Sequence, residues 1–203
     1  MTKRGQEASR ANVVSSFTIV KGTMIEESYA ALAAWDFDRT KRQNLDHVRE
    51  VNLVGAKSQT WLRDGGKVLN RRFDPSGRDR PLALLAKAGW GLDEWKPALL
   101  WHLTRDEFLF RDFLVGWLYP NWAEGAHRLG PEELYDFLRE VGRRGGVTEH
   151  AWGEATLERG AVGLLRMAAD FGLLKGTAIR EFASYHLPER SFLYLLHALR
   201  DAE

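Results

Sequence analysis

The chain contains no cysteine among its 203 residues. Disulfides, thiol nucleophiles and thiolate metal sites are therefore excluded, and a reducing cytoplasm is compatible with the sequence. No apolar run approaches the roughly 18 residues that a membrane-spanning helix needs. The polar start of the chain also lacks the hydrophobic core of a secretion signal. We therefore expect a cytoplasmic protein with no membrane partner.

The chain has a net charge close to zero, and it contains neither of two common catalytic motifs. The 29 lysines and arginines nearly balance the 28 acidic residues, which leaves a net charge of +1. Any anion site must therefore come from local clustering. The six histidines are scattered, and neither a HExxH zinc motif nor a GxSxG nucleophile elbow occurs. We expect no enzymatic activity, no cofactor and no metal site, although a metal-dependent nuclease stays open because such enzymes gather distant carboxylates.

Helical signals recur along the whole chain. Three segments, beginning at Thr23, Thr40 and Thr104, fit the capping box, in which a hydroxyl and a Glu or Gln side chain satisfy free amides at a helix start. Apolar residues repeat at spacings of three and four. The apolar residues of 178–187 follow no clear period, so this segment could form a short strand, a loop or a helix. The sequence predicts an all-α fold, a compact multi-helix bundle with at most a short β-hairpin in the last third.

The segment after Thr104 is the most aromatic part of the chain, and we interpret it as the central core helix. Large residues on it and just before it should be buried, namely Trp101, Phe113, Leu114 and Trp117. A basic, glycine-rich break at residues 142–146 suggests a boundary between two helical subdomains. The predicted organisation is a flexible tail over residues 1–14, an N-terminal helical subdomain over 15–142 and a C-terminal helical subdomain over 143–203.

The stretch from residue 57 to residue 80 is strongly basic. Placing residues 54–73 on a helix at about 100° per residue puts Lys57, Arg63, Lys67 and Arg71 within one arc of roughly 120° and apolar residues on another face. Arg63, Lys67 and Arg71 follow at i, i+4 and i+8, so their heads rise along one ridge roughly 6 Å apart. This spacing suits consecutive phosphates of a nucleic-acid strand. Gly65 and Gly66 each lower helix stability by about 1 kcal/mol relative to Ala. The stretch could therefore form either one helix or two helices with a break at these glycines.

We predict a nucleic-acid interface formed by the seven lysines and arginines of residues 57–80. A solvated charged face with no ligand is the competing interpretation, and a loop with Arg143 and Arg144 is the next candidate for an anion contact. The predicted nucleic-acid-binding residues are Lys57, Arg63, Lys67, Arg71, Arg72, Arg78 and Arg80.

Six short motifs are distributed over most of the chain. They are residues 21–28 (KGTMIEES), 52–58 (NLVGAKS), 71–73 (RRF), 171–174 (FGLL), 185–188 (YHLP) and 194–197 (YLLH). Together they resemble a known protein family, the small BrxA proteins of bacteriophage exclusion (BREX) systems.

The resemblance implies a mostly helical accessory protein of a phage-defence cassette that binds double-stranded DNA without known catalysis. The family does not indicate which residues touch DNA, so the basic-helix assignment comes from the residues alone. The leading hypothesis is therefore a DNA-binding accessory protein of low sequence preference. The alternative is an adaptor that docks on another BREX protein, such as the methyltransferase, through an exposed aromatic or charged helix.

Overall fold

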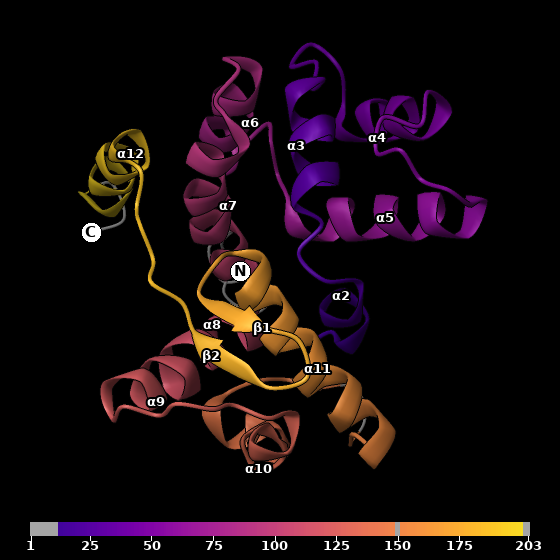
Figure 1. The fold of residues 1–203 in the computed structure, drawn as a ribbon. Helices are drawn as coiled ribbons and strands as arrows, with labels where there is room; N and C mark the ends of the chain where they lie inside the picture. Colours follow the sequence, from indigo (N-terminus) through magenta and orange to yellow (C-terminus); the bar gives the residue numbers. More distant parts are fainter. Residues whose placement is uncertain (1–11, 149–150, 201–203) are drawn as a thin grey trace. The chain divides into compact units, whose positions relative to one another are not determined.

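The computed structural model describes residues 12–148 and 151–200. This part of the chain is mostly helical, with one antiparallel hairpin near the C-terminus (Figure 1), which confirms the predicted fold class. The chain forms two units, one from Met1–Thr23 with Thr104–Tyr185 and one from Met24–Leu103 with His186–Glu203. Each unit thus joins two segments that are distant in sequence. The glycine-rich break at residues 142–146 lies inside the first unit rather than between the two.

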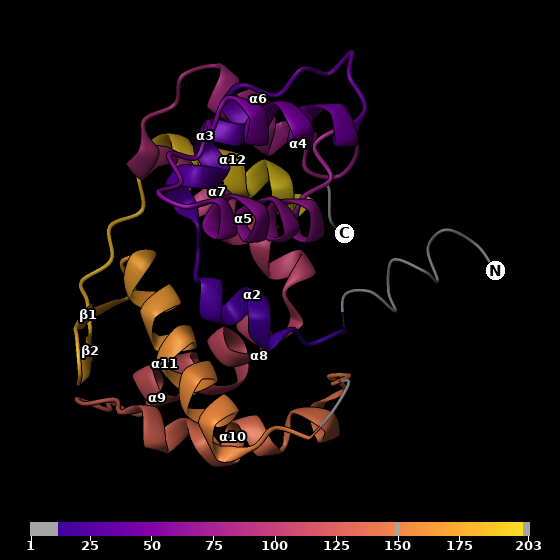
Figure 2. The same cartoon turned by 90° about the vertical axis from the view of Figure 1, so that its right-hand side faces the viewer.

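The first unit is organised around the long helix α11 (Glu154–Asp170), which packs on α2 (Ser16–Lys21) and α10 (Tyr135–Arg139) (Figure 2). The chain leaves α11 directly into the hairpin of β1 (Leu174–Gly176) and β2 (Arg180–Phe182), with Leu174 opposite Phe182. The remaining elements are α8 (Phe108–Phe113), a π-helix (Leu114–Leu118), α9 (Tyr119–Ala123) and two 3₁₀ turns (Pro131–Leu134, Val141–Arg144).

Local sequence explains how α2 forms and packs. The Ser15 side chain accepts a hydrogen bond from the Thr18 amide at the start of α2, and Gly22 ends the helix with a φ of 80°. A Cβ at Gly163 of α11 would lie only 3.0 Å from both the Cγ2 and the carbonyl oxygen of Ile19. The close approach of α11 to α2 therefore depends on glycine at this position.

Stacked aromatic rings form the core of the first unit. Phe110 lies 6.0 Å from Phe171 and 6.3 Å from Phe113, and Phe113 lies 5.6 Å from Trp117, between ring centroids. Phe113 and Trp117 are buried, as predicted, whereas Leu114 is half-buried. Trp101, which belongs to the second unit, is also half-buried.

Residues 12–14 do not belong to a flexible tail. Val13 pairs with Val147, the Val14 amide donates to the Val147 carbonyl at 2.9 Å, and Val14 is buried. This backbone pairing and burial correct the predicted tail at its C-terminal end. Residues 1–11 of the predicted tail lie outside the described residues.

In its described residues, the regular elements of the second unit are all helices. Its centre is Trp95, which is fully buried and donates its indole N–H to the Leu82 carbonyl at 3.1 Å. Helix α3 (Ile25–Ala33) packs on α6 (Arg80–Lys87), and α4 (Lys41–Glu50) packs on α5 (Gln59–Arg72). The other helices are α12 (Glu189–Arg200) and α7 (Leu92–Asp106), of which α7 runs three residues past the unit boundary.

Only one of the three predicted capping boxes exists. Thr40 caps α4 with both reciprocal bonds to Gln43. Thr23 instead donates its hydroxyl to Asp170 at 2.8 Å, because α3 begins one residue later, after Met24 in the left-handed conformation. Thr104 lies within the last turn of α7 rather than at a helix start.

Candidate nucleic-acid interface

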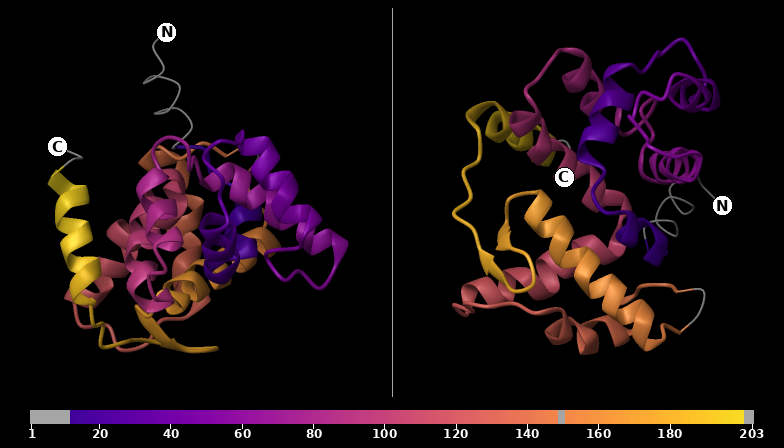
Figure 3. Two further views of the ribbon diagram at one scale, coloured as in Figure 1. Left: turned by 90° about the horizontal axis from the view of Figure 1, so that it is seen from above. Right: turned by 45° about the vertical axis from the view of Figure 1, so that its right-hand side comes forward.

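Helices α4 and α5 pack against each other (Figure 3). Residues of both helices line a groove of about 570 Å³, which we call the α4–α5 groove. Cations from both helices line it, with a single acid, Asp46, among the lining residues of the described chain. The lining residues are Lys41, Arg42, Leu45, Asp46 and Arg49 of α4, and Leu62, Arg63, Gly66, Lys67 and Asn70 of α5.

The amphipathic pattern of the two helices orients these cations. Asn44 and Val48 are the buried residues of α4, and α5 buries one face that includes Val68 and Leu69. The opposite faces of both helices therefore turn outwards. Helix α5 runs through both central glycines without a break. A Cβ at Gly66 would meet nothing within 4 Å, so this glycine leaves open space in the groove.

Most of the groove cations keep their charged heads in solvent. The side chains of Arg42, Arg63 and Arg49 are 92%, 63% and 60% exposed. Lys67 is also exposed. Lys41 ties the two helices together, because its Nζ donates to the Asn70 carbonyl at 2.7 Å. An anion in the groove could therefore approach several cations from two helices at once.

Two of the seven predicted binding residues, Arg63 and Lys67, line the groove. Arg72 is 0% exposed, so it cannot contact DNA in this conformation and its assignment is corrected. Its position follows from helical phase, because Arg72 lies one turn after the buried Val68.

The other predicted cations lie outside the groove lining. Lys57 is exposed and precedes the helix, whose N-cap is Ser58, and Arg71 is half-buried. Arg78 pairs with Asp79 at 3.5 Å. Arg80 lies over the Phe37 ring, 4.2 Å from its centroid. The structure therefore does not bring these cations together into one ridge.

Sequence reasoning missed the contribution of α4, which supplies Lys41, Arg42 and Arg49. The spacing of Arg42 and Arg49, seven residues apart on a helix that a capping box starts, places them on one face. That signal was available in the sequence. The pairing of this face with α5 was not.

The next candidate, the loop with Arg143 and Arg144, is used partly for internal contacts. Arg144 pairs with Asp112 at 2.9 Å and lies 3.7 Å over the Phe137 ring. Arg143 is exposed and pairs with Glu140 at 2.8 Å. Only Arg143 of this pair presents a largely solvent-exposed guanidinium.

A hydrogen-bonded network in the second unit links α7, α12 and the residue that precedes α6. His102 Nδ1 lies 2.6 Å from Asp79 Oδ1, and Nε2 lies 2.7 Å from the Tyr194 hydroxyl. An ionised carboxylate only accepts, so Nδ1 carries a proton and donates it to Asp79. His102 and Asp79 are both buried, so the network joins α12 to α7 rather than presenting an open site. Asp106, the neighbour four residues from His102 in sequence, has no part in these bonds.

The pKa of Asp79 lies below its ordinary value of 3.8. Burial on its own raises this pKa, because it disfavours the charged form. The hydrogen bond and charge of His102, the Asp74 amide and Arg78 together outweigh burial and favour the carboxylate.

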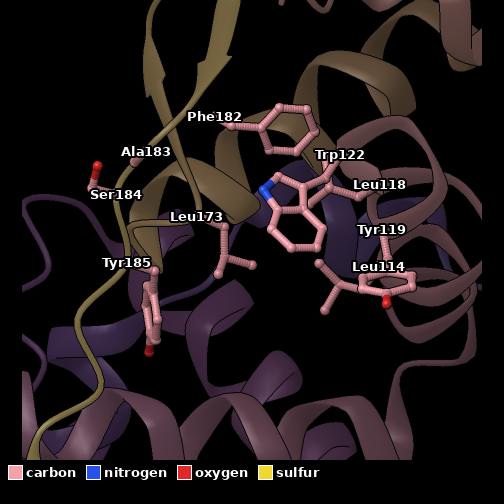
Figure 4. A pocket seen from close by; sticks show the side chains of 9 residues that line it. All are labelled: Leu114, Leu118, Tyr119, Trp122, Leu173, Phe182, Ala183, Ser184 and Tyr185. Carbon is pink, nitrogen blue, oxygen red and sulfur yellow. The ribbon is translucent and has the colours of Figure 1, made fainter. Parts of the chain in front are cut away.

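The first unit contains an apolar pocket of about 670 Å³ (Figure 4). Trp122 and Phe182 are among the aromatic side chains that line it, and the lining includes no charged side chain. Partial burial raises the pKa of Tyr185, another of the lining residues. The lining residues are Leu114, Leu118, Tyr119, Trp122, Leu173, Phe182, Ala183, Ser184 and Tyr185.

Within residues 12–148 and 151–200, no three histidine or acidic side chains lie close enough together to hold a metal ion. In the same residues, no helix combines the length and the apolar character that crossing a membrane requires.

Comparison with known proteins gives two findings. A family model described as BrxA matches residues 15–198. A crystal structure of an uncharacterized protein from Magnetospirillum magneticum matches with a TM-score of 0.70 and 15% sequence identity, over 93% of this chain and 94% of that chain. At this identity the likeness shows the fold alone. No curated protein matches the chain.

Proposed function

Because the chain belongs to the BrxA family and is therefore an accessory protein of BREX phage defence, we propose that it binds double-stranded DNA through the α4–α5 groove. The observation that supports this proposal is the convergence of five cations from two helices on one groove, most with solvent-exposed heads. Duplex DNA presents closely spaced phosphates, which such a set of cations neutralises. We propose binding alone, without catalysis.

The proposed contacts are to phosphates, so they position the protein without reading bases. Low sequence preference follows. Each neutralised phosphate releases condensed counterions, and log affinity should fall with log salt by about 0.9 per contact. A DNA ligand also agrees with the cytoplasmic location that we expect from the sequence.

The test is a fluorescence anisotropy titration of labelled duplexes at several salt concentrations. The variant replaces three groove cations with Ala, namely Arg42, Arg63 and Lys67. We expect its salt slope to flatten by about 2 to 3 units, equally for unrelated duplex sequences. Its melting temperature should stay close to that of the parent, because the three heads are exposed.

The matched control replaces three exposed cations of the first unit, Arg128, Arg159 and Lys175, with Ala. It changes the net charge by the same amount, so it distinguishes an effect of the groove on DNA affinity from an effect of total charge. Leu69→Ala on the buried face of α5 should instead cost about 2–5 kcal/mol of stability. If the groove variant keeps the parental affinity and slope, the groove is not the DNA site.

The apolar pocket favours a second candidate function, docking on another BREX protein such as the methyltransferase. Tyr119 and Trp122 are 62% and 57% exposed at this pocket. Exposed aromatic residues around an apolar hollow are typical of protein–protein contact sites. The adaptor proposal predicts that Trp122→Ala abolishes co-purification with the partner while duplex binding is unchanged. Co-purification that survives Trp122→Ala at parental yield contradicts this assignment of the pocket.

A further inference from the structure

Asp46 occupies an unusual place for an acid, since it lines the groove that cations otherwise dominate. Its carboxylate lies 2.8 Å from the guanidinium of Arg49 and 3.8 Å from that of Arg42. The Asp46 side chain is itself 40% exposed. The carboxylate therefore lies against two of the cations that the proposed function assigns to phosphate.

A carboxylate and a phosphate diester offer the same feature to a guanidinium, a pair of anionic oxygens that accept hydrogen bonds. Arg49 cannot direct the same N–H group to both. We propose that Asp46 is an intramolecular competitor of DNA phosphate, which holds Arg42 and Arg49 in the free protein and weakens DNA binding. This inference rests on the proposed function of the α4–α5 groove.

Such a competitor favours anions that contact several cations of the groove at once over anions that contact only one or two. A single small anion that displaces Asp46 gains little, because the arginines exchange one anionic partner for another and Asp46 is left beside a negative charge. A duplex backbone gains the additional contacts of Arg63 and Lys67 at the same time. Asp46 therefore tunes the groove towards ligands that carry several adjacent phosphates, and it keeps the affinity for any duplex moderate.

The ordinary role of such an acid is to stabilise its own helix. Pairs at i, i+3 and i, i+4 contribute about 0.2–0.5 kcal/mol each to helix stability. That role alone predicts no gain in DNA affinity when the carboxylate is removed. DNA affinity thus distinguishes a competitor from a helix-stabilising residue.

The experiment measures duplex affinity and salt slope for Asp46→Asn by anisotropy titration. The matched control is Asp93→Asn, because Asp93 also lies on a helix of the second unit, pairs with a cation three residues away at 3.3 Å and changes net charge equally. For Asp46→Asn we expect about three- to tenfold tighter binding, the effect of one unit charge at about 6 Å under largely aqueous screening. The salt slope should steepen by about 0.9. Asp93→Asn should stay within about twofold of the parent.

A double variant tests whether the effect passes through Arg49. In an Arg49→Ala background, Asp46→Asn should tighten binding less than in the parent, because the arginine that it releases is gone. If Asp46→Asn binds like Asp93→Asn, the competitor role is overturned even though the groove cations matter. If the Arg42, Arg63 and Lys67 variant binds like the parent, the proposed function itself fails and Asp46 has no phosphate to compete with.

Discussion

Replacing Asp79 with Asn (Asp79→Asn) tests the buried network that joins α12 to the rest of its unit. The carboxylate holds His102 Nδ1 at 2.6 Å through Oδ1, and its Oδ2 accepts the Asp74 amide at 2.7 Å. Asn keeps one accepting oxygen but turns an NH₂ group towards one of these two donors. One bond to a charged acceptor is lost and buried donors face each other, so we expect a loss of about 2–5 kcal/mol of stability at neutral pH.

The same variant should remove a pH dependence. The pKa of Asp79 is lowered in the folded protein, so its contribution to stability is complete above the ordinary value of 3.8 and is lost as pH falls through the lower folded value. The stability difference between the parent and Asp79→Asn should therefore be largest near neutral pH. It should shrink steadily as pH drops below 3.8.

The assay is urea unfolding followed by circular dichroism between pH 7 and about pH 3, with the same series for Tyr194→Phe. Tyr194→Phe removes one neutral hydroxyl and should cost only about 1 kcal/mol, with no change in the acid dependence of stability. The reasoning is refuted if Asp79→Asn unfolds within about 0.5 kcal/mol of the parent at pH 7. It is equally refuted if the stability difference persists undiminished at the acid end.

Three further substitutions test the fold by thermal melting. Thr40→Ala should cost about 1 kcal/mol, because it removes the cap of α4; an unchanged melting temperature would contradict the cap. Gly163→Ala should cost about 1–3 kcal/mol through its clash with Ile19, and a stabilised variant would show that α2 and α11 do not touch there. Trp117→Ala should cost about 3–5 kcal/mol, whereas parental melting would place this ring at the surface.

The sequence predicted local structure correctly where neighbouring residues alone determine it. The Thr40 capping box needs only four consecutive residues, and it forms as predicted. The same pattern failed at Thr23 and Thr104 because partners elsewhere decide those positions. Thr23 donates to Asp170, 147 residues away in sequence, and Thr104 lies in a helix that began at Leu92. A four-residue motif contains no information about such partners.

In the candidate site too, the features with a local cause were predicted and those that depend on tertiary packing were not. Helical phase correctly put Arg63 and Lys67 on one exposed face, while counting charge alone added Arg72, which the phase places with the buried Val68. The groove itself requires α4 beside α5, and single-helix patterns do not reveal which faces meet. The partners of His102 were equally inaccessible, because they lie 23 and 92 residues away.

The order of the chain has a consequence for biosynthesis. Each unit needs residues from both ends of its range, since residues 12–23 belong with Thr104–Tyr185 and α12 belongs with Met24–Leu103. A ribosome delivers residues in order, and domains generally fold as they emerge. The second unit must therefore wait for α12 to leave the exit tunnel, whereas the first is complete once Tyr185 has emerged. A nascent chain that stalls before α12 holds a finished first unit and a second unit in which His102 still lacks its tyrosine partner.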